Sequence, residues 1–339
     1  MSTNYATKRV GQAVFTFFVT VSLSFFLYQA MPGGPVEALK NMILSQQSTS
    51  AGTVDLERIN RLVNLYTNLE PDAPLYVQYF QYWASLLFEQ DLGRSIYQNE
   101  DVTALIFQRV PWSMFISVYA LVIGYAGSIF IGALMAFKEK SRFDSVSSVL
   151  MIVLNSIPYY IVGVVLILFV AIRWGWFPYG GRAASSLTPG FSPEYLWSIA
   201  YHAALPVFSM SILGLGGALT MRGNSVRVLG EDYLRVAELR GLRSSRIATQ
   251  YVGRNAILPM YTQFMIGIAG VLSSSVIVEQ IFSYPGVGLL LYQAIQVRDY
   301  PLLMGGLIIF TTVTIVGILV ADLTYGFIDP RISAGGDDA

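Results

Sequence analysis

The sequence predicts an all-α integral membrane protein that crosses the bilayer six times. Hydrophobic residues make up 54% of the 339 positions and charged residues only 12%, whereas an ordinary soluble domain carries about 25% charged residues. The 21 basic and 21 acidic residues cancel, so the overall charge does not indicate nucleic acid or another polyanion as a partner. The sequence has no cysteine, which excludes disulfides, thiolate metal sites and thiol nucleophiles.

Six apolar runs lack Asp, Glu, Lys and Arg. They are Val10 to Met31, Trp112 to Phe137, Val146 to Ile172, Tyr195 to Met221, Ala256 to Val278 and Tyr300 to Ala321. Crossing about 30 Å of hydrocarbon at about 1.5 Å per residue takes about 20 residues, which each run provides. Buried helices of a soluble protein are a poor alternative, because such helices keep a charged face. A signal peptide is a poor alternative for the first run, because the run is long and no typical cleavage site follows it.

The distribution of Lys and Arg predicts that both termini are cytoplasmic. When the amino terminus is placed inside, the cytoplasmic segments receive 13 of the 21 basic residues and the external segments receive 8. Most of the external ones lie in one long segment, Pro32 to Pro111, which the positive-inside rule discounts. That segment is expected to form a small extracytoplasmic cap between the first and second spans.

The expected cap contains two stretches with helical spacing. Asp55 to Leu69 repeats apolar side chains at nearly helical intervals, and Pro74 to Glu89 carries an aromatic face. Short packed or interfacial helices are therefore expected. We expect the aromatic face to serve packing, and a binding role is the alternative.

The connection between the fourth and fifth spans, Arg222 to Leu258, is the most informative cytoplasmic segment. Residues 231–241 predict a short helix. Glu231 and Asp232 favour the positive amino end of that helix, and Gly241 can take the left-handed conformation that ends it.

A second helix of this connection is expected to begin at Ser244 and to run toward Pro259. On the first helix, Tyr233, Leu234 and Ala237 are expected to lie near one another, and the small Ala237 would allow close approach of a partner. This arrangement predicts a docking element. A basic amphipathic hairpin resting on anionic lipid headgroups is the alternative.

These residues carry a family resemblance. Tyr233 to Gly241, followed by Arg254 to Pro259, resembles the cytoplasmic EAA loop of ABC importer permeases, with a spacing similar to that of the dipeptide/oligopeptide branch. Glu238 and Leu239 depart from the pattern, because they occupy positions where small or basic residues are common. Further segments similar to this branch, in matching order, are Met31 to Pro35, Asp91 to Ser95, Ser156 to Pro158 with Gly163, Glu279 to Gly288, Arg298 to Pro301, Asp322 to Tyr325 and Asp329 to Arg331.

The resemblance implies a type I ABC importer permease fold. Residues 112–330 would form the core, with spans two to six and a coupling loop at about 223–258; residues 1–111 would add the first span and the cap, and residues 331–339 a polar cytoplasmic tail. The implied setting is the prokaryotic plasma membrane, with a homologous second permease subunit, two ATP-binding subunits and an extracytoplasmic substrate-binding protein. The implied function is import of short peptides by alternating access. Oligosaccharides and nickel complexes are the alternative cargoes.

By the same resemblance, the ATPase contact falls on one short set of residues in the coupling loop, with Arg240 and Arg243 as surrounding cations. The set is Glu231, Tyr233, Arg235, Ala237, Glu238 and Gly241. No catalytic, cofactor-binding or metal-binding residue is expected, because the sequence lacks a Gly-x-x-x-x-Gly-Lys nucleotide loop, a Gly-x-Gly-x-x-Gly turn and a His/carboxylate cluster. ATP and magnesium would therefore bind to the partner ATPases.

Two other classes of function are weaker alternatives. A stand-alone secondary transporter would place ionisable residues within the spans, and His202 is the only one there. We expect His202 to be a hydrogen-bonded packing residue. An intramembrane enzyme would need a nucleophile with a base or a set of metal ligands, and one histidine without cysteine fits this poorly.

Overall fold

The structure is a computed structural model that describes residues 3–30, 39, 56–243, 246–271 and 276–328. It divides into two compact units: residues 1–112 with 286–339 form the first, and residues 113–285 form the second. Helices make up almost all regular structure among the described residues. Several features expected from the sequence lie outside them, namely the motifs Met31 to Pro35 and Asp329 to Arg331, the helix start at Ser244 and the tail 331–339.

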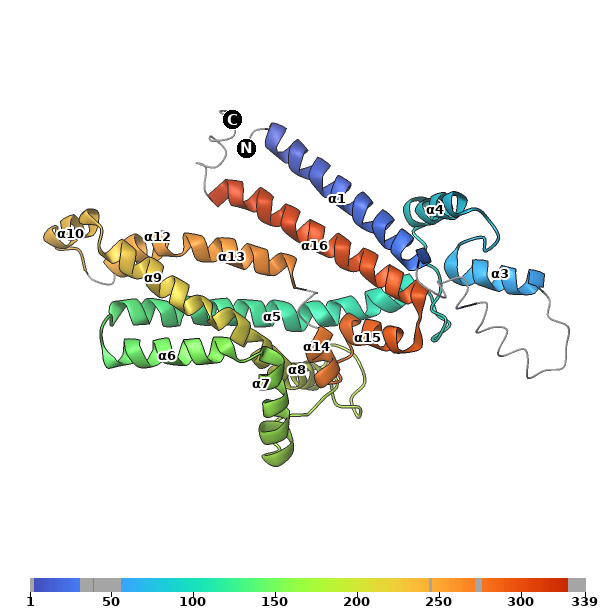
Figure 1. Ribbon diagram of the computed structural model, residues 1–339. Helices are drawn as coiled ribbons and strands as arrows, with labels where there is room; N and C mark the ends of the chain where they lie inside the picture. Colours follow the sequence, from blue (N-terminus) through green and yellow to red (C-terminus); the bar gives the residue numbers. More distant parts are fainter. Residues whose placement is uncertain (1–2, 31–38, 40–55, 244–245, 272–275, 329–339) are drawn as a thin grey trace. The chain divides into compact units, whose positions relative to one another are not determined.

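The frame of the first unit is a pair of long helices, α1 (Thr3–Ala30) and α16 (Tyr300–Ile328), which lie side by side (Figure 1). They run antiparallel, because Phe25 near the end of α1 packs with Met304 near the start of α16. At the opposite end of the pair, Arg9 forms an ion pair with Asp322 at 3.3 Å. The contact between the first and last predicted spans therefore extends along most of their length.

Two short helices of the same unit match the two stretches with helical spacing, and the second of them packs against α1. They are α3 (Leu56–Thr67) and α4 (Leu75–Ala84), and a π-helical turn, η1 (Ser85–Glu89), continues α4. The ring of Trp83 stacks on Phe18, with centroids 5.1 Å apart. The hydroxyl groups of Tyr79 and Ser22 share a hydrogen bond of 2.7 Å. The expected packing role holds for Tyr79, Tyr82 and Trp83, whereas Tyr76 and Phe80 are exposed.

A buried carboxylate joins two of the recognised motifs within the first unit. Helix α15 (Val287–Val297) ends at Arg298, which has a left-handed backbone, and the next residue, Asp299, is 1% exposed. Asp299 Oδ2 accepts a hydrogen bond from the Ser95 hydroxyl at 2.5 Å and another from the Tyr97 amide at 3.2 Å. The motifs at residues 91–95 and 298–301 therefore form one hydrogen-bonded contact.

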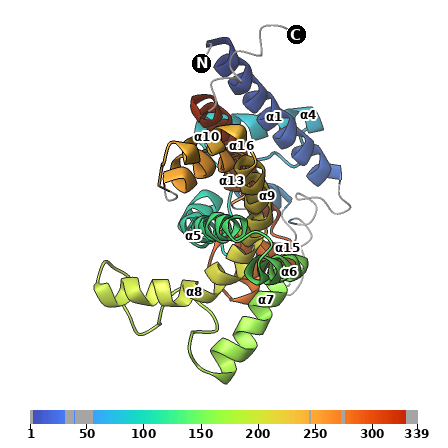
Figure 2. The same ribbon diagram turned by 90° about the vertical axis from the view of Figure 1, so that its left-hand side faces the viewer.

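The second unit begins with the main part of α5 (Val102–Phe137), which a short turn joins to the antiparallel α6 (Arg142–Ser156). After α6 the third predicted span bends by 92° into α7 (Tyr159–Leu166) and the π-helical η2 (Ile167–Arg173). Figures 1 and 2 show α7 leading away from α6. The bend falls at Ile157, which is extended (φ −92°, ψ 122°), because the proline that follows disfavours helical backbone in the residue before it.

The fourth predicted span forms α8 (Pro193–Leu215) and α9 (Gly217–Leu229). Its backbone touches that of α5, since a Cβ atom added to Gly124 would lie 2.5 Å from the Ser211 carbonyl oxygen. His202 Nδ1 lies 2.7 Å from the Ser198 carbonyl oxygen of the same helix. This hydrogen bond to the preceding turn confirms the packing role expected for the histidine.

Not all six predicted spans are continuous helices. In the described part of the chain, four helices are long and apolar enough to cross a bilayer, and the bent pair is a fifth if it counts as one span. The four stretches are Thr7–Ala30, Val102–Phe137, Pro193–Leu229 and Tyr300–Asp322. The remaining apolar run is divided between α13 (Leu258–Ala269) and α14 (Val276–Ile281), and residues 272–275 lie outside the described residues. The structure therefore supports a helical protein that crosses the membrane several times, but it does not confirm the predicted number of six transmembrane helices.

An ion pair fixes the start of α6 to α9. Ser141 caps α6 by accepting a hydrogen bond from the Asp144 amide, and the Asp144 carboxylate accepts two hydrogen bonds from Arg222, at 2.6 and 2.7 Å. The side chains are 5% and 28% exposed. Two-point contact between a planar guanidinium and a carboxylate is strong and fixes orientation. From the sequence, Arg222 is only one of the cytoplasmic charges, and no local motif indicates Asp144 as its partner.

Replacing Asp144 with Asn is expected to destabilise the second unit by about 2 kcal/mol, because the Arg222 guanidinium loses its carboxylate in a largely buried setting. The thermal unfolding midpoint of the purified chain in detergent measures this loss. Glu57→Gln is the matched control. It removes an exposed partner of Arg61 that lies 3.9 Å away, which should cost less than about 0.5 kcal/mol. Equal midpoints for the two variants would contradict the assigned role of the pair.

Candidate functional site

The candidate site is a hairpin at the far end of α9, residues 230–256. Helix α9 stops at Leu229, Gly230 turns the chain, and α10 (Asp232–Leu239) follows. The returning chain forms a π-helical segment, η3 (Ile247–Gly253), and then α12 (Arg254–Ala256), which leads into α13. Figure 1 shows α10 beyond the ends of α9 and α12.

The end of α10 is set by its glycine, as the sequence predicts. Gly241 has φ +71°, a conformation that costs an L residue with a side chain about 1–2 kcal/mol. The amide of Leu242 then donates to the carbonyl oxygen of Ala237 at 3.3 Å. This bond satisfies one of the free carbonyl groups at the helix end and reverses the chain.

The hairpin has its own small hydrophobic core. Leu234 and Ala237 from α10 are buried together with Ile247 and Val252 from the returning segment. Ala237 is only 3% exposed, so its small side chain allows the two arms of the hairpin to approach each other. The sequence predicts that this small residue admits a partner; in the structure it faces the second arm of the same hairpin.

The opposite face of α10 is exposed and partly apolar. Leu239 is 83% exposed and Val236 is 49% exposed, and they lie one turn apart. Tyr233 is 40% exposed, and its hydroxyl accepts a hydrogen bond of 3.1 Å from the Asn255 side chain. Exposed large apolar side chains that lie together on a short helix are typical of a protein contact. We call Tyr233, Val236 and Leu239 the outer face of α10.

The residues that the sequence assigned to this site differ in their exposure. Glu231, Tyr233, Arg235 and Gly241 are exposed, as are the flanking Arg240 and Arg243, whereas Ala237 is buried; the Glu238 side chain lies outside the described residues. Val236 and Leu239 are not among the residues predicted from the sequence. Their spacing could have indicated them, since they lie across the helix from the apolar residues Leu234 and Ala237.

The base of the hairpin is firmly held by the rest of the second unit. Met221, Ala256 and Met260 are buried together against side chains of α5, among them Tyr125 and Ile129. A Cβ atom added to Gly132 of α5 would lie 2.4 Å from the Ala218 carbonyl oxygen, so the α5 and α9 backbones touch here. With the Asp144–Arg222 ion pair, these contacts join the base of the hairpin to α5 and α6.

The chemistry of the hairpin suits protein contact rather than catalysis. Among the described residues, no group of three or more His, Cys, Asp or Glu side chains could hold a metal ion. The exposed groups of α10 are apolar, phenolic or charged. They form an exposed surface on a multi-pass α-helical membrane protein.

Comparison with known proteins places the chain in a family. Residues 128–334 match the model of the binding-protein-dependent transport system inner membrane component, and the chain belongs to this family. It is similar to the oligopeptide transport system permease protein AppB of Bacillus subtilis, at 31% identity over 91% of this chain and 93% of the relative. The dipeptide transport system permease protein DppB of Lactococcus lactis is 30% identical over 97% of this chain and 98% of the relative. DppB of Escherichia coli K12 is 30% identical over 96% and 97%.

Membership of this family makes the chain a membrane-embedded transport subunit and not an enzyme in its own right. A binding protein is part of such a transport system by definition, and relatives named as permease proteins cover nearly the whole chain. The family resemblance inferred from the motifs is therefore confirmed.

Replacing Gly241 with Ala is expected to loosen the end of α10, because a side chain disfavours the left-handed conformation by about 1 kcal/mol or more. Hydrogen exchange at the amides of residues 236–242 should become faster. Gly223→Ala is the control, since a Cβ atom there meets nothing within 4 Å and lies inside α9. It should leave exchange unchanged or slower. If the amides of residues 236–242 exchange at the same rate in the two variants, the turn at Gly241 does not depend on glycine.

Proposed function

We propose that this chain is the permease subunit of an ABC importer for short peptides and that α10 couples it to a partner ATPase. The observation that carries the proposal is the outer face of α10, an exposed apolar surface on a hairpin whose base is fixed to α5 and α6. Relatives that match more than nine-tenths of the chain are named as oligopeptide and dipeptide permease proteins. These names favour peptides over oligosaccharides or nickel complexes as cargo.

The ATPase contact is proposed for Glu231, Tyr233, Arg235, Ala237, Glu238 and Gly241, together with Val236 and Leu239. These residues have different roles. The outer face supplies apolar area that a partner groove would cover, and Arg235 supplies charge. Ala237 sets the spacing of the two arms, and Gly241 sets the end of α10. ATP and magnesium would bind to the ATPase, with no cofactor in this chain.

The transport mechanism we propose is alternating access driven from this hairpin. ATP binding would move the two ATPases together, and each would carry the α10 that is docked on it. The Asp144–Arg222 ion pair and the packing of Met221, Ala256 and Met260 on α5 support transmission of that movement. A homologous second permease subunit would complete the pathway, and an extracytoplasmic binding protein would deliver the peptide.

The proposed membrane topology has six spans, with both termini and the hairpin in the cytoplasm of a prokaryotic cell. Residues 1–111 would contribute the first span and an extracytoplasmic cap, residues 112–330 the permease core, and residues 331–339 a cytoplasmic tail. The excess of Lys and Arg on the hairpin side supports this orientation. The aromatic packing of α4 on α1 supports a folded cap.

Leu239→Asp is expected to remove most co-purifying ATPase and to lower ATP-driven uptake of labelled peptide at least ten-fold, because a charge then enters an apolar contact. The measurement uses proteoliposomes that contain the permease pair, the ATPases and the binding protein. Leu239 is 83% exposed, so the substitution should leave the thermal unfolding midpoint unchanged.

Phe191→Asp is the matched control for that experiment. Phe191 is 95% exposed and lies in the segment proposed to face outward, so ATPase co-purification should be unaffected. Normal ATPase binding by the Leu239 variant would reject the coupling role of the outer face. Peptide uptake by the chain alone, driven by an ion gradient, would reject the importer proposal and favour a secondary transporter.

Single cysteines are expected to report the orientation directly, because the natural chain contains none. Ser186→Cys should react with a membrane-impermeant maleimide in intact cells, whereas Glu139→Cys should react only after the membrane is opened. Both positions are exposed within the chain. The reverse pattern would show that the termini and the hairpin lie outside.

A further inference from the structure

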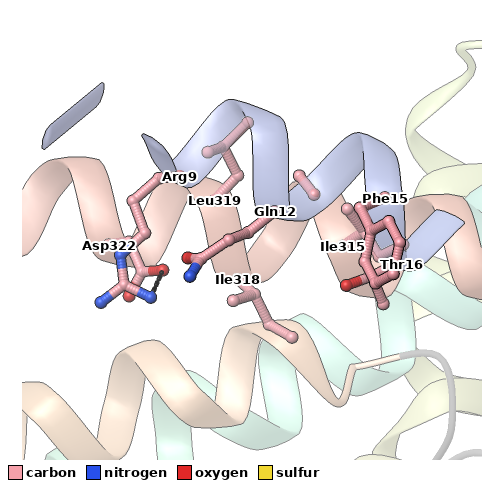
Figure 3. A pocket seen from close by; sticks show the side chains of 9 residues that line it. Arg9, Gln12, Phe15, Thr16, Ile315, Ile318, Leu319 and Asp322 are labelled. Atoms are coloured by element: carbon pink, nitrogen blue, oxygen red, sulfur yellow. Dashed lines mark ion pairs between the residues drawn. The ribbon is translucent and has the colours of Figure 1, made fainter. Parts of the chain in front are cut away.

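An elongated hollow between α1 and α16 has polar groups at one end and apolar groups at the other. Its volume is about 340 Å³. Figure 3 shows Arg9, Gln12 and Asp322 gathered at one end, with Phe15 and Ile315 at the other. The lining residues are Arg9, Gln12, Ala13, Phe15, Thr16, Ile315, Ile318, Leu319 and Asp322. All of them belong to the first compact unit.

The depth of this hollow coincides with the edge of the membrane. Arg9 and Asp322 lie at the limits of two apolar stretches long enough to cross the bilayer, Thr7–Ala30 and Tyr300–Asp322. Phe15 lies six residues further along α1, about 9 Å deeper at 1.5 Å per residue. Since each interfacial layer of a bilayer is about 5–8 Å thick, the polar end lies at headgroup depth and Phe15 among the acyl chains.

The apolar wall is exposed to whatever surrounds these helices. Phe15 is 68% exposed and Ile318 is 48% exposed within the chain. In a bilayer, an acyl chain would cover such side chains. The hollow thus combines a surface suited to an acyl chain with a polar end at the level of the headgroups.

The polar end carries one charge of each sign. Arg9 Nη1 and Asp322 Oδ2 are 3.3 Å apart, and both side chains remain partly exposed, at 39% and 27%. An exposed ion pair of this kind contributes only about 0–1 kcal/mol to stability. A ligand can therefore bind to both charged groups with little loss of ion-pair energy. The arginine fork matches a phosphate group, and the carboxylate matches an ammonium group that can donate hydrogen bonds.

We propose that this hollow binds one phospholipid whose headgroup carries both a phosphate and a primary ammonium, as in phosphatidylethanolamine. Arg9 and Gln12 hold the phosphate, Asp322 accepts hydrogen bonds from the ammonium, and the start of an acyl chain lies along Phe15 and Ile318. Phosphatidylglycerol carries the phosphate but no ammonium group, so Asp322 would lie near an anion and gain no cationic partner. Phosphatidylcholine has no N–H to donate. The lipid would join the amino-terminal helix to α16 at the membrane edge.

Native mass spectrometry of the purified full-length chain with its partner subunits tests this proposal, with phosphatidylethanolamine, phosphatidylglycerol and phosphatidylcholine added in turn. We expect one tightly retained phosphatidylethanolamine. Arg9→Gln should weaken its retention about five-fold, the loss expected for one cation near a lipid surface. Asp322→Asn should remove the preference for phosphatidylethanolamine over phosphatidylcholine.

Ala13→Phe provides a second variant that leaves both charges in place and fills the hollow. It should also abolish the tight lipid while the complex stays assembled. Arg61→Gln, which alters an exposed arginine outside the hollow, is the control and should change nothing. Equal retention of the three lipids, or an unaltered preference in Asp322→Asn and Ala13→Phe, would overturn the proposal. Equal retention would mean that the hollow does not select a headgroup, and an unaltered preference would place the selective lipid site elsewhere.

Discussion

A bilayer interior offers no water to the peptide backbone, so each amide and carbonyl group must find its partner within the protein. This constraint explains why the described chain is helical almost throughout. It also explains where the helices can break. The third span bends at Ile157 and Pro158, and the fourth is interrupted at Gly216 between α8 and α9.

Close contacts between helix backbones hold the second unit together. With lipid around them, helices gain little from hydrophobic association and depend on packing and hydrogen bonds. Glycines on α5 therefore meet the α8 and α9 backbones directly, at Gly124 and Gly132. A side chain at either position would force the helices apart. The same contacts hold the base of the hairpin, and transmission of movement from α10 is proposed to run through them.

Three acidic residues near helix ends differ in how deeply they are buried and in the partners that they contact. Asp144 is nearly buried and receives both arms of the Arg222 guanidinium, while Asp299 is buried and receives neutral donors from Ser95 and Tyr97. Both fix one element to another. Asp322 and Arg9 remain partly exposed at the end of a hollow. In the proposed lipid site, these two groups would contact the headgroup.

The sequence by itself determined the class of the protein, the position of its apolar runs and the end of α10 at Gly241. These follow from local chemistry: hydrocarbon selects uncharged runs, and a left-handed turn selects glycine. The tertiary structure decided which face of α10 is buried, because that depends on the returning arm that carries Ile247 and Val252. It also decided that Asp144 meets Arg222, 78 residues away, and that Ser95 meets Asp299, 204 residues away. The packing of segments that are distant in the sequence determines these partners, so no local pattern of residues predicts them.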